Sequence, residues 1–207
     1  MIILLSCRRL YTGSAETFWA GCGAVRRLEF TEVGGFDTVR FPRPQIEDIE
    51  LGYRLRDRGG RIVLDPLIQG THLKRWTLGG MLRTDLLDRG IPWMLLLLER
   101  RGRTAQALNA GRSEQLKVGI AALATLLLLS AALLGSAQPV LLAALLFAIL
   151  ATSNLPMYAW FARQRGIGFS LAVIPLHLAH YVSNAVAAIV GIARHVTHGR
   201  AIHASRA

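Results

Sequence analysis

The second half of the chain lacks acidic residues, and this feature most constrains what the chain can fold into. Residues 118–207 contain five arginines, no Asp or Glu, and long runs of Leu, Ala, Ile and Val, whereas residues 1–117 hold all 13 acids. A stretch this long without a carboxylate is typical of membrane-spanning helices, because charged groups are costly in a bilayer. We therefore predict a soluble half followed by a membrane half, divided near Lys117.

Three apolar runs make up the membrane half, at residues 118–134, 140–162 and 169–193. The shortest, at about 1.5 Å of helix rise per residue, barely reaches across a hydrocarbon core of about 30 Å. Pro156 and Pro175 fall inside the second and third runs, where we expect them to kink the helices rather than end them, since neighbouring helices can satisfy the freed carbonyls. The pattern predicts an all-α region of about three transmembrane helices.

Basic residues beside these runs predict an orientation. Several arginines and Lys117 precede the first run, so the positive-inside rule places the soluble half in the cytoplasm of a multi-pass protein of the cell (plasma) membrane. A third crossing would then place Arg194, Arg200 and Arg206 outside, against the rule. Either these arginines are exported or the third run does not fully cross; three spans are our prediction.

The third run carries polar side chains at membrane depth. His177, His180, Tyr181 and Asn184 stand three and four residues apart, on one face of a helix. Polar groups at this depth are costly and often functional. Two histidines are too few ligands for a metal, so we favour hydrogen bonds between helices, or contacts with lipid headgroups, over metal binding.

Residues 91–103, IPWMLLLLERRGR, link the two halves. The apolar stretch is too short to span a bilayer, but Pro92 suits the start of a helix and Trp93 suits a membrane–water interface. One interpretation is an interfacial helix whose arginines lie near anionic headgroups. The other is a buried helix of the soluble half, and the pattern leaves both open.

The densest acidic cluster of this basic chain, whose net charge is +11, lies in the segment PRPQIEDIELGYRLRDRGG. From Ile49 to Leu55 apolar residues alternate with others, which favours a strand. The order of charges favours a helix, because Glu47, Asp48 and Glu50 come first, arginines come last and two glycines follow. The pattern alone leaves strand and helix open.

Five segments in order resemble the C-terminal half of the family 2 glycosyltransferases. They are FWAGCGAVRR, EVGGFD, EDIELGYRLRDRG, RIVLDP and the histidine at position 72, and they run from Phe18 to His72. The resemblance implies an α/β fold, a partial A-type glycosyltransferase domain, in residues 1–90. An interfacial helix and basic connector would follow in residues 91–117, and the all-α transmembrane helices in residues 118–207.

The resemblance also implies roles for the acidic pair. In that family an E-D pair opens a helix beside the acceptor, and its aspartate is taken as the general base. By this likeness Asp48 is the base, Glu47 supports or orients it, and the segment after them is a helix. Inverting sugar transfer does need a carboxylate near the attacking hydroxyl, and a helix N-terminus holds a carboxylate ionised and oriented. The plain alternative is an acidic helix start without a catalytic role.

Further site residues follow the acidic pair. His72 falls where some relatives carry a histidine that helps hold a divalent metal, magnesium or manganese, at the donor diphosphate; a loop histidine bonded to backbone is the equal alternative. HLKRW resembles the QxxRW motif of processive members, with His for Gln and a shorter spacing from the acidic pair. The likeness makes Lys74, Arg75 and Trp76 candidates for phosphate or acceptor contacts.

The resemblance does not extend to the donor-binding half of the family. That half carries the nucleotide-sugar fold and a D-x-D motif, but no D-x-D occurs in the chain. We therefore expect a truncated or fragmentary product, or one that needs an N-terminal half or partner subunit, and we expect it to be inactive alone. Complete, it would transfer sugar from a nucleotide-sugar to an acceptor, such as a polyprenyl or other lipid, at the cytoplasmic face.

The alternative function is a membrane adaptor whose basic part binds anionic membrane lipids or a partner protein. The charge also raises the idea of nucleic-acid binding. The sequence argues against it, because the basic residues are divided between loops and membrane flanks and form no stripe or reader motif.

Overall fold

The computed structural model describes residues 13–15, 17–65, 67–68, 70, 75–100 and 111–204. In the soluble half the elements are β1 (Gly13–Ala15), the 3₁₀ turn η1 (Ala20–Cys22), α2 (Arg27–Glu32), α3 (Glu47–Asp57), β2 (Ile62–Leu64), α4 (Leu78–Arg83), the π-helix η2 (Thr84–Gly90) and α5 (Ile91–Glu99). The membrane half consists of α6 (Arg112–Leu134), α7 (Gln138–Ser153), α8 (Leu155–Arg165) and α9 (Ile167–Ala204).

The predicted α/β fold, a partial A-type glycosyltransferase domain, is wrong. Of the residues that the structure describes, 74% are helical. Among the described residues β1 and β2 form an antiparallel ribbon of three residues each, with Gly13 opposite Leu64, and no parallel sheet. The physical reason lies in strand length and connection, because a doubly wound sheet needs several longer strands joined by crossover helices. The strand predicted from RIVL does form, as β2, but it pairs with β1 alone.

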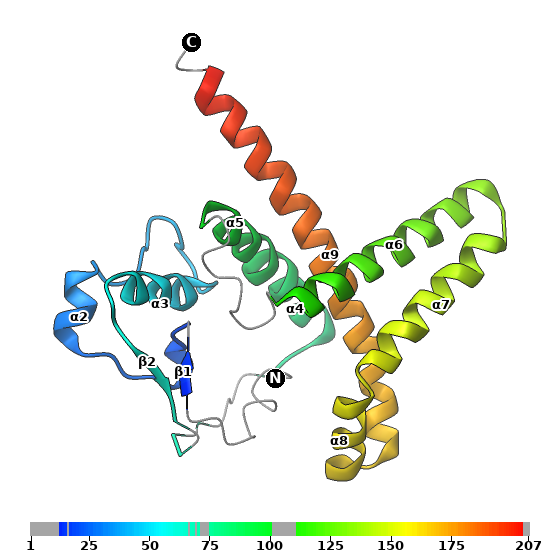
Figure 1. Ribbon diagram of the computed structural model, residues 1–207, viewed down its shortest axis with the longest axis horizontal. Coiled ribbons are helices and arrows are strands. Elements are labelled where there is room, and N and C mark those ends of the chain that lie inside the picture. The colour runs from blue at the N-terminus through cyan, green and yellow to red at the C-terminus, as the bar shows by residue number, and fades with distance from the viewer. Residues whose placement is uncertain are drawn as a thin grey trace.

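α3 is the central element of the soluble half (Figure 1). It begins on the predicted acids, carries Arg54 and Arg56 in its last turn, and is followed by Gly59 in the left-handed conformation at φ 84°. Leu51 and Leu55 pack with Phe18 on one side of the helix. On the other side a second cluster packs against α5, and its members are Phe41, Ile46, Ile49, Tyr53, Trp93 and Leu96. Burial on two sides accounts for the alternating apolar pattern, which by itself resembles that of a strand.

A close backbone contact fixes the position of α3. A Cβ atom at Gly52 would lie 2.3 Å from the backbone nitrogen of Phe18 and 3.0 Å from backbone atoms of Thr17. The glycine therefore lets the helix press directly on the segment between β1 and η1. The same contact brings the first turn of α3 next to η1, where the candidate base lies.

The membrane half contains two helices long and apolar enough to span a bilayer, Arg112–Leu134 and Ile167–Thr197. A third span results if α7 and α8 are counted as one, although they are bent by 62° at Asn154. The chain does bend near Pro156, but α7 ends and α8 begins there, so the prediction of a kink within one continuous helix is wrong at this position, whereas α9 passes through Pro175 as a single helix. These helices mark the chain as a membrane protein.

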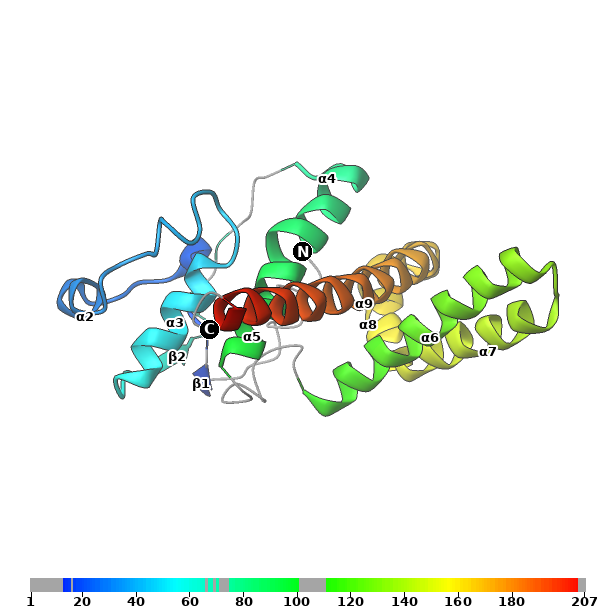
Figure 2. The ribbon, with the colours of Figure 1, turned by 90° about the horizontal axis from the view of Figure 1, so that it is seen from above.

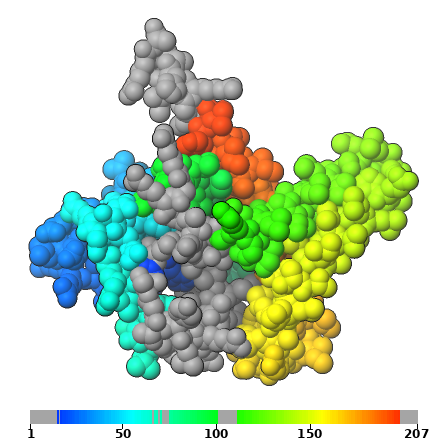
Figure 3. Space-filling view, in the orientation of Figure 1, coloured from blue at the N-terminus to red at the C-terminus, as the bar shows by residue number. Residues whose placement is uncertain are grey.

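α6 and α7 form a hairpin that projects from the rest of the molecule (Figure 3). Gly135, in the left-handed conformation at φ 63°, ends α6 and lets the chain turn. Seen from above, the hairpin turn and the soluble helices α2 and α3 lie at opposite ends of the molecule (Figure 2). Exposed leucines such as Leu126, Leu133 and Leu141 cover the hairpin surface, as expected for helices that face lipid.

Candidate functional site

Asp48 lies in the first turn of α3 and is held by two backbone groups. Its Oδ1 accepts a hydrogen bond from the N–H of Ile49 at 2.8 Å. Its Oδ2 accepts one from the N–H of Ala20, in η1, at 3.2 Å. The unpaired N–H groups at a helix start favour a carboxylate, and the second bond fixes how this one is turned. The FWAGCGAV segment and the acidic pair are thus brought into contact.

Burial raises the pKa of Asp48 above its ordinary value of 3.8. The hydrogen bonds from Ala20 and Ile49 act against this by stabilising the ionised form, while the nearby carboxylate of Glu47 raises the pKa further. A carboxylate with a raised pKa holds a proton more tightly and is the stronger base. The environment of Asp48 therefore suits a group that accepts a proton.

Glu47, its neighbour, points back along the chain. Its Oε2 accepts a hydrogen bond from the backbone N–H of Gln45 at 2.6 Å. This bond fixes the loop that enters α3, and the residue before the helix, Ile46, is almost completely buried at 1% exposure. The contact is the kind that a supporting residue makes, as the sequence predicts for Glu47.

Arg54 ties α3 to the end of α2. Its Nε and Nη2 donate to the carboxylate of Glu50, each at 2.7 Å, and Nη2 also donates to the carbonyl oxygen of Gly35 at 2.7 Å. Nη1 donates to the carbonyl oxygen of Val33. One half-buried guanidinium thus satisfies two loop carbonyls and one carboxylate. The third acid of the cluster, Glu50, therefore has a structural contact and is not free to act at a site.

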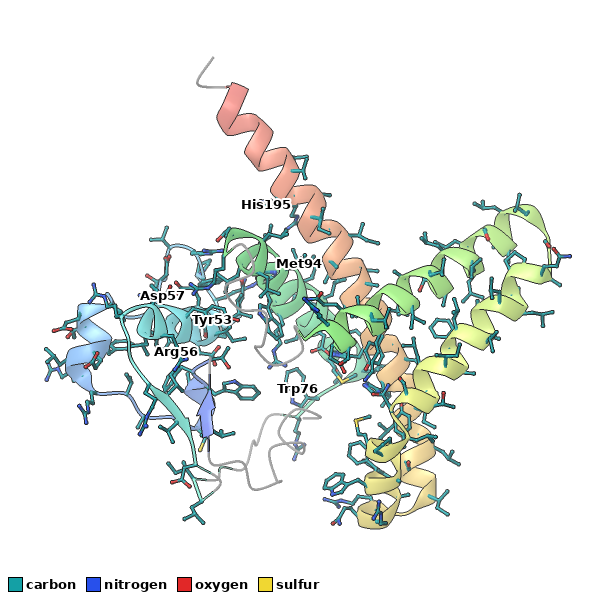
Figure 4. The ribbon with its side chains drawn as sticks, viewed as in Figure 1. Tyr53, Arg56, Asp57, Trp76, Met94 and His195 are labelled. Carbon is teal, nitrogen blue, oxygen red and sulfur yellow. The ribbon has the colours of Figure 1, made fainter. Side chains whose placement is uncertain are left out.

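α3 and the loop before it are joined to η2 and to the end of α5 by three ion pairs, each with an N–O distance of 2.7 Å. They are Arg40–Glu99, Arg43–Asp88 and Arg100–Asp57. The Arg100 guanidinium also stacks over the ring of Tyr53, 4.6 Å from its centroid, and Tyr53 and Asp57 both lie on α3 (Figure 4). The helix that carries Asp48 is therefore anchored to α5, the element that leads into the membrane half.

The other predicted site residues lie elsewhere or outside the described part of the chain. His72 and Lys74 fall outside the described residues. Arg75 is exposed, and Trp76 lies 5.9 Å from the guanidinium of Arg89, which belongs to η2. Figure 4 shows Trp76 away from α3. The structure thus brings Asp48 and Glu47 together but places Trp76 near η2 instead.

The predicted divalent metal has no assembled site within the described residues. No group of three or more His, Cys, Asp or Glu side chains gathers there in a way that could hold a metal ion. Asp48 and Glu47 offer two carboxylates, and both already accept hydrogen bonds from the backbone. The residues around Asp48 therefore do not fit a metal, and the role suggested for His72 stays a prediction.

A network of polar groups lies in the membrane half, near the start of α6. Lys117 Nζ donates to Glu114 Oε1 at 2.8 Å and to Asn154 Oδ1 at 3.0 Å. The hydroxyl of Tyr181 donates to Glu114 Oε2 at 3.1 Å and contacts Asn154 Oδ1 at 3.4 Å. The network therefore joins α6, the break between α7 and α8, and α9. We call these four residues, which lie at the base of the α6–α7 hairpin, the hairpin-base network.

Two further contacts extend this polar region along α9. The Tyr158 hydroxyl and His177 Nδ1 are 2.8 Å apart, which joins α8 to α9. Three residues further along the same face of α9, His180 Nδ1 lies 3.4 Å from Asp85 of η2, and Asn184 lies 3.1 Å from the second ring nitrogen of His180. His177, His180 and Tyr181 thus make the predicted contacts between helices, one of which reaches the soluble half, whereas the contact of Asn184 lies within α9.

Sequence reasoning missed the partners of several of these residues. Ala20 contributes only its backbone N–H, and no side-chain pattern could identify it as the partner of Asp48. From the sequence alone, Lys117 is assigned to the basic flank of the first span. Its spacing of three residues from Glu114 on a helix permits the ion pair that the structure shows. Asn154, two residues before Pro156, was the available sign of a helix break with a polar function.

No protein-family model, curated protein or solved structure significantly matches the chain.

Proposed function

We propose that the chain is the acceptor-side part of a membrane-bound glycosyltransferase and that Asp48 is its general base. The observation that carries the proposal is the environment of Asp48, a partly buried carboxylate with a raised pKa at the start of a helix. Two backbone N–H groups orient it. The resemblance of residues 18–72 to family 2 glycosyltransferases assigns the same residue to the same role. Proton transfer to Asp48 depends on the placement of this carboxylate and does not itself require a parallel sheet.

The chemical step that we propose is an inverting transfer. Asp48 accepts the proton of the acceptor hydroxyl while the hydroxyl oxygen attacks the anomeric carbon of the donor. The new glycosidic bond forms as the bond from that carbon to the diphosphate breaks, and the nucleoside diphosphate leaves with the electron pair. Glu47 holds the loop before α3 and so keeps the base in position. A second part or subunit would supply the nucleotide-sugar.

The anchoring of α3 supports an acceptor that comes from the membrane. α3 and its preceding loop are joined to η2 and α5 by three ion pairs. η2 and α5 in turn pack on α9 of the membrane half. A base fixed relative to the bilayer could meet a lipid-linked hydroxyl at a constant height, which favours a polyprenyl or other lipid acceptor over a soluble one.

The test is sugar transfer by membranes that contain the chain together with its co-purifying partners, supplied with labelled nucleotide sugars. Asp48→Asn should lower the transfer rate by about 10² to 10⁴-fold, the usual contribution of a general base. Glu32→Gln, on the exposed surface of α2, is the matched control and should leave the rate unchanged. Transfer by Asp48→Asn at the wild-type rate, with circular dichroism unchanged, would reject the proposal. The purified chain alone should show no transfer.

A membrane adaptor is the second candidate function. The observation that favours it is the net charge of +11, with Arg75, Arg83 and Arg112 among the exposed basic residues. Under this function Asp48→Asn has no effect, and binding to vesicles containing anionic lipid falls when these three arginines are replaced by glutamine. The two functions are therefore separated by the same pair of measurements.

A further inference from the structure

α9 meets the α6–α7 hairpin only near the hairpin's base, within the contacts that the structure describes. Tyr181 hydrogen-bonds to Glu114 and contacts Asn154, at the start of α6 and the end of α7. Its ring packs with Ala121 and Leu150, which also lie in the half of the hairpin away from the turn. In Figure 1 α9 runs across this base rather than along the two hairpin helices. A third span would instead be expected to pack along them.

Beyond Tyr181, α9 packs on elements of the soluble half. A Cβ atom at Gly191 would lie 2.7 Å from Met94 Cγ of α5, and one at Gly90 of η2 would lie 2.7 Å from Ala187 Cβ. Met94 is seen beside α9 in Figure 4. Because no candidate span occurs among the described residues before Arg112, we take η2 and α5 to lie on the side of the membrane from which α6 enters. The second half of α9 is therefore held on that same side.

The charges of the membrane half agree with this placement. The turn between α6 and α7, with the sequence GSA, and the first residues of α7 are uncharged, as suits the far side of a membrane. Every basic residue after α7 lies either at the end of α8 or in the C-terminal part of α9 and the tail. They are Arg163, Arg165, Arg194, Arg200 and Arg206. If α9 does not cross, all of them stay on the near side and the conflict with the positive-inside rule disappears.

We infer that only the α6–α7 hairpin crosses the membrane and that α9, with α8 beside it, lies along the near leaflet. α9 has 38 residues, about 57 Å of helix, which is nearly twice the thickness of a hydrocarbon core of about 30 Å. Its partner is the lipid of one leaflet. Leu171, Ile189 and Ile192 are exposed and enter the acyl region, while the arginines meet anionic headgroups.

The decisive experiment measures the side on which single cysteines react. In a background with Cys7→Ser and Cys22→Ser, a membrane-impermeant maleimide is applied to sealed vesicles of both orientations. Ser113→Cys marks the near side, Ala137→Cys marks the far side, and Thr197→Cys reports α9; all three positions are exposed. We expect Thr197→Cys to react only from the side of Ser113→Cys, with Ala137→Cys reacting only from the other.

Three results of that experiment would overturn the inference. Reaction of Thr197→Cys from the side of Ala137→Cys would show that α9 crosses. Reaction of Ala137→Cys from the side of Ser113→Cys would show that the hairpin does not cross. Reaction of Thr197→Cys from neither side would place the end of α9 inside the bilayer. None of these results depends on glycosyl transfer, so the inference stands or falls separately from the proposed function.

Two crosslinking experiments test the packing of α9 on α5 and the proposal that lipid covers the exposed face of α9. Oxidation of the pair Met94→Cys and Gly191→Cys should join α5 to α9, detected after protease cleavage at a site inserted in the α6–α7 turn; no crosslink would contradict the placement. A photoreactive residue at Ile189 should attach to lipid, as should the control at Leu128 of α6, both exposed. Attachment of Ile189 to a protein would show that a protein partner, rather than lipid, covers this face.

Discussion

The guanidinium of Arg100 donates two hydrogen bonds, of 2.7 and 2.8 Å, to the carboxylate of Asp57 and so joins the end of α5 to the end of α3. The pairing is bidentate, and the same guanidinium stacks over Tyr53 of α3. Such forked contacts combine charge with fixed geometry, which a lysine cannot reproduce. Asp48, the candidate base, therefore lies on a helix that Arg100, at the end of α5, helps to hold in position.

Loss of the bidentate Arg100–Asp57 contact should weaken the attachment of α3 to α5. Arg100→Lys should lower the free energy of unfolding of the soluble half by about 1–2 kcal/mol, from the lost fork and the weakened stacking on Tyr53. The measurement is thermal unfolding in detergent, followed by tryptophan fluorescence. Arg40→Lys is the comparison and should cost less, because Arg40 is more exposed than Arg100 and makes one hydrogen bond to its partner Glu99 rather than two. Equal effects from the two substitutions would show that the Arg100 contact is not the stronger one.

Gly52 offers a test of how closely α3 packs. A Cβ atom there would lie 2.3 Å from the backbone nitrogen of Phe18, which cannot move aside as a side chain could. Gly52→Ala should therefore destabilise the soluble half by about 1–3 kcal/mol, despite alanine's better helix propensity. Gly79→Ala in α4 is the control, because nothing lies within 4 Å of its Cβ position. That variant should be neutral or slightly stabilised in the same melting experiment.

The two halves of the chain differed in how far sequence could predict them. The membrane half was predictable because the cost of a charge in lipid leaves a strong compositional sign in residues 118–207. The charge order favoured the helix from Glu47 to Asp57, but its two buried faces gave the alternation of a strand, and the resemblance to the glycosyltransferases decided between the two. The lack of a parallel sheet was not predictable from the short motifs, which specify local turns and helix starts but not the strand neighbours on which a sheet depends.

The two acids of the candidate site could be predicted from the sequence, but the groups that contact them could not. Asp48 and Glu47 share the first turn of α3, as expected. The N–H of Ala20 that orients Asp48 depends on tertiary packing at Gly52, a contact between segments far apart in sequence. The packing of α9 against η2 depends on contacts such as that of His180 with Asp85, which hydropathy does not record.

The stability of the hairpin-base network should depend on each of its charged partners. Lys117→Met leaves the carboxylate of Glu114 without its cation, and an uncompensated charge near the bilayer is costly. We expect a loss of stability larger than that of Tyr181→Phe, which removes only a hydroxyl and should cost about 1 kcal/mol. Resistance of α6 and α9 to proteolysis in membranes measures both effects. If Tyr181→Phe proves the more damaging variant, the ion pair is not the centre of the network.

The raised pKa of Asp48 predicts an unusual dependence of stability on pH. Because the folded protein binds this proton more tightly than the unfolded chain, whose pKa is near 3.8, the contribution of Asp48 to stability is full below that value and is lost as the pH rises through the higher folded pKa. At neutral pH the buried carboxylate thus opposes folding. Asp48→Asn should be more stable than wild type at pH 7, with the advantage shrinking toward pH 4. Thermal melts across this range measure the difference, and Glu32→Gln is the control that should follow wild type. A variant less stable than wild type at pH 7 would mean that the hydrogen bonds from Ala20 and Ile49 outweigh burial, and that Asp48 is a structural helix start rather than a strained base.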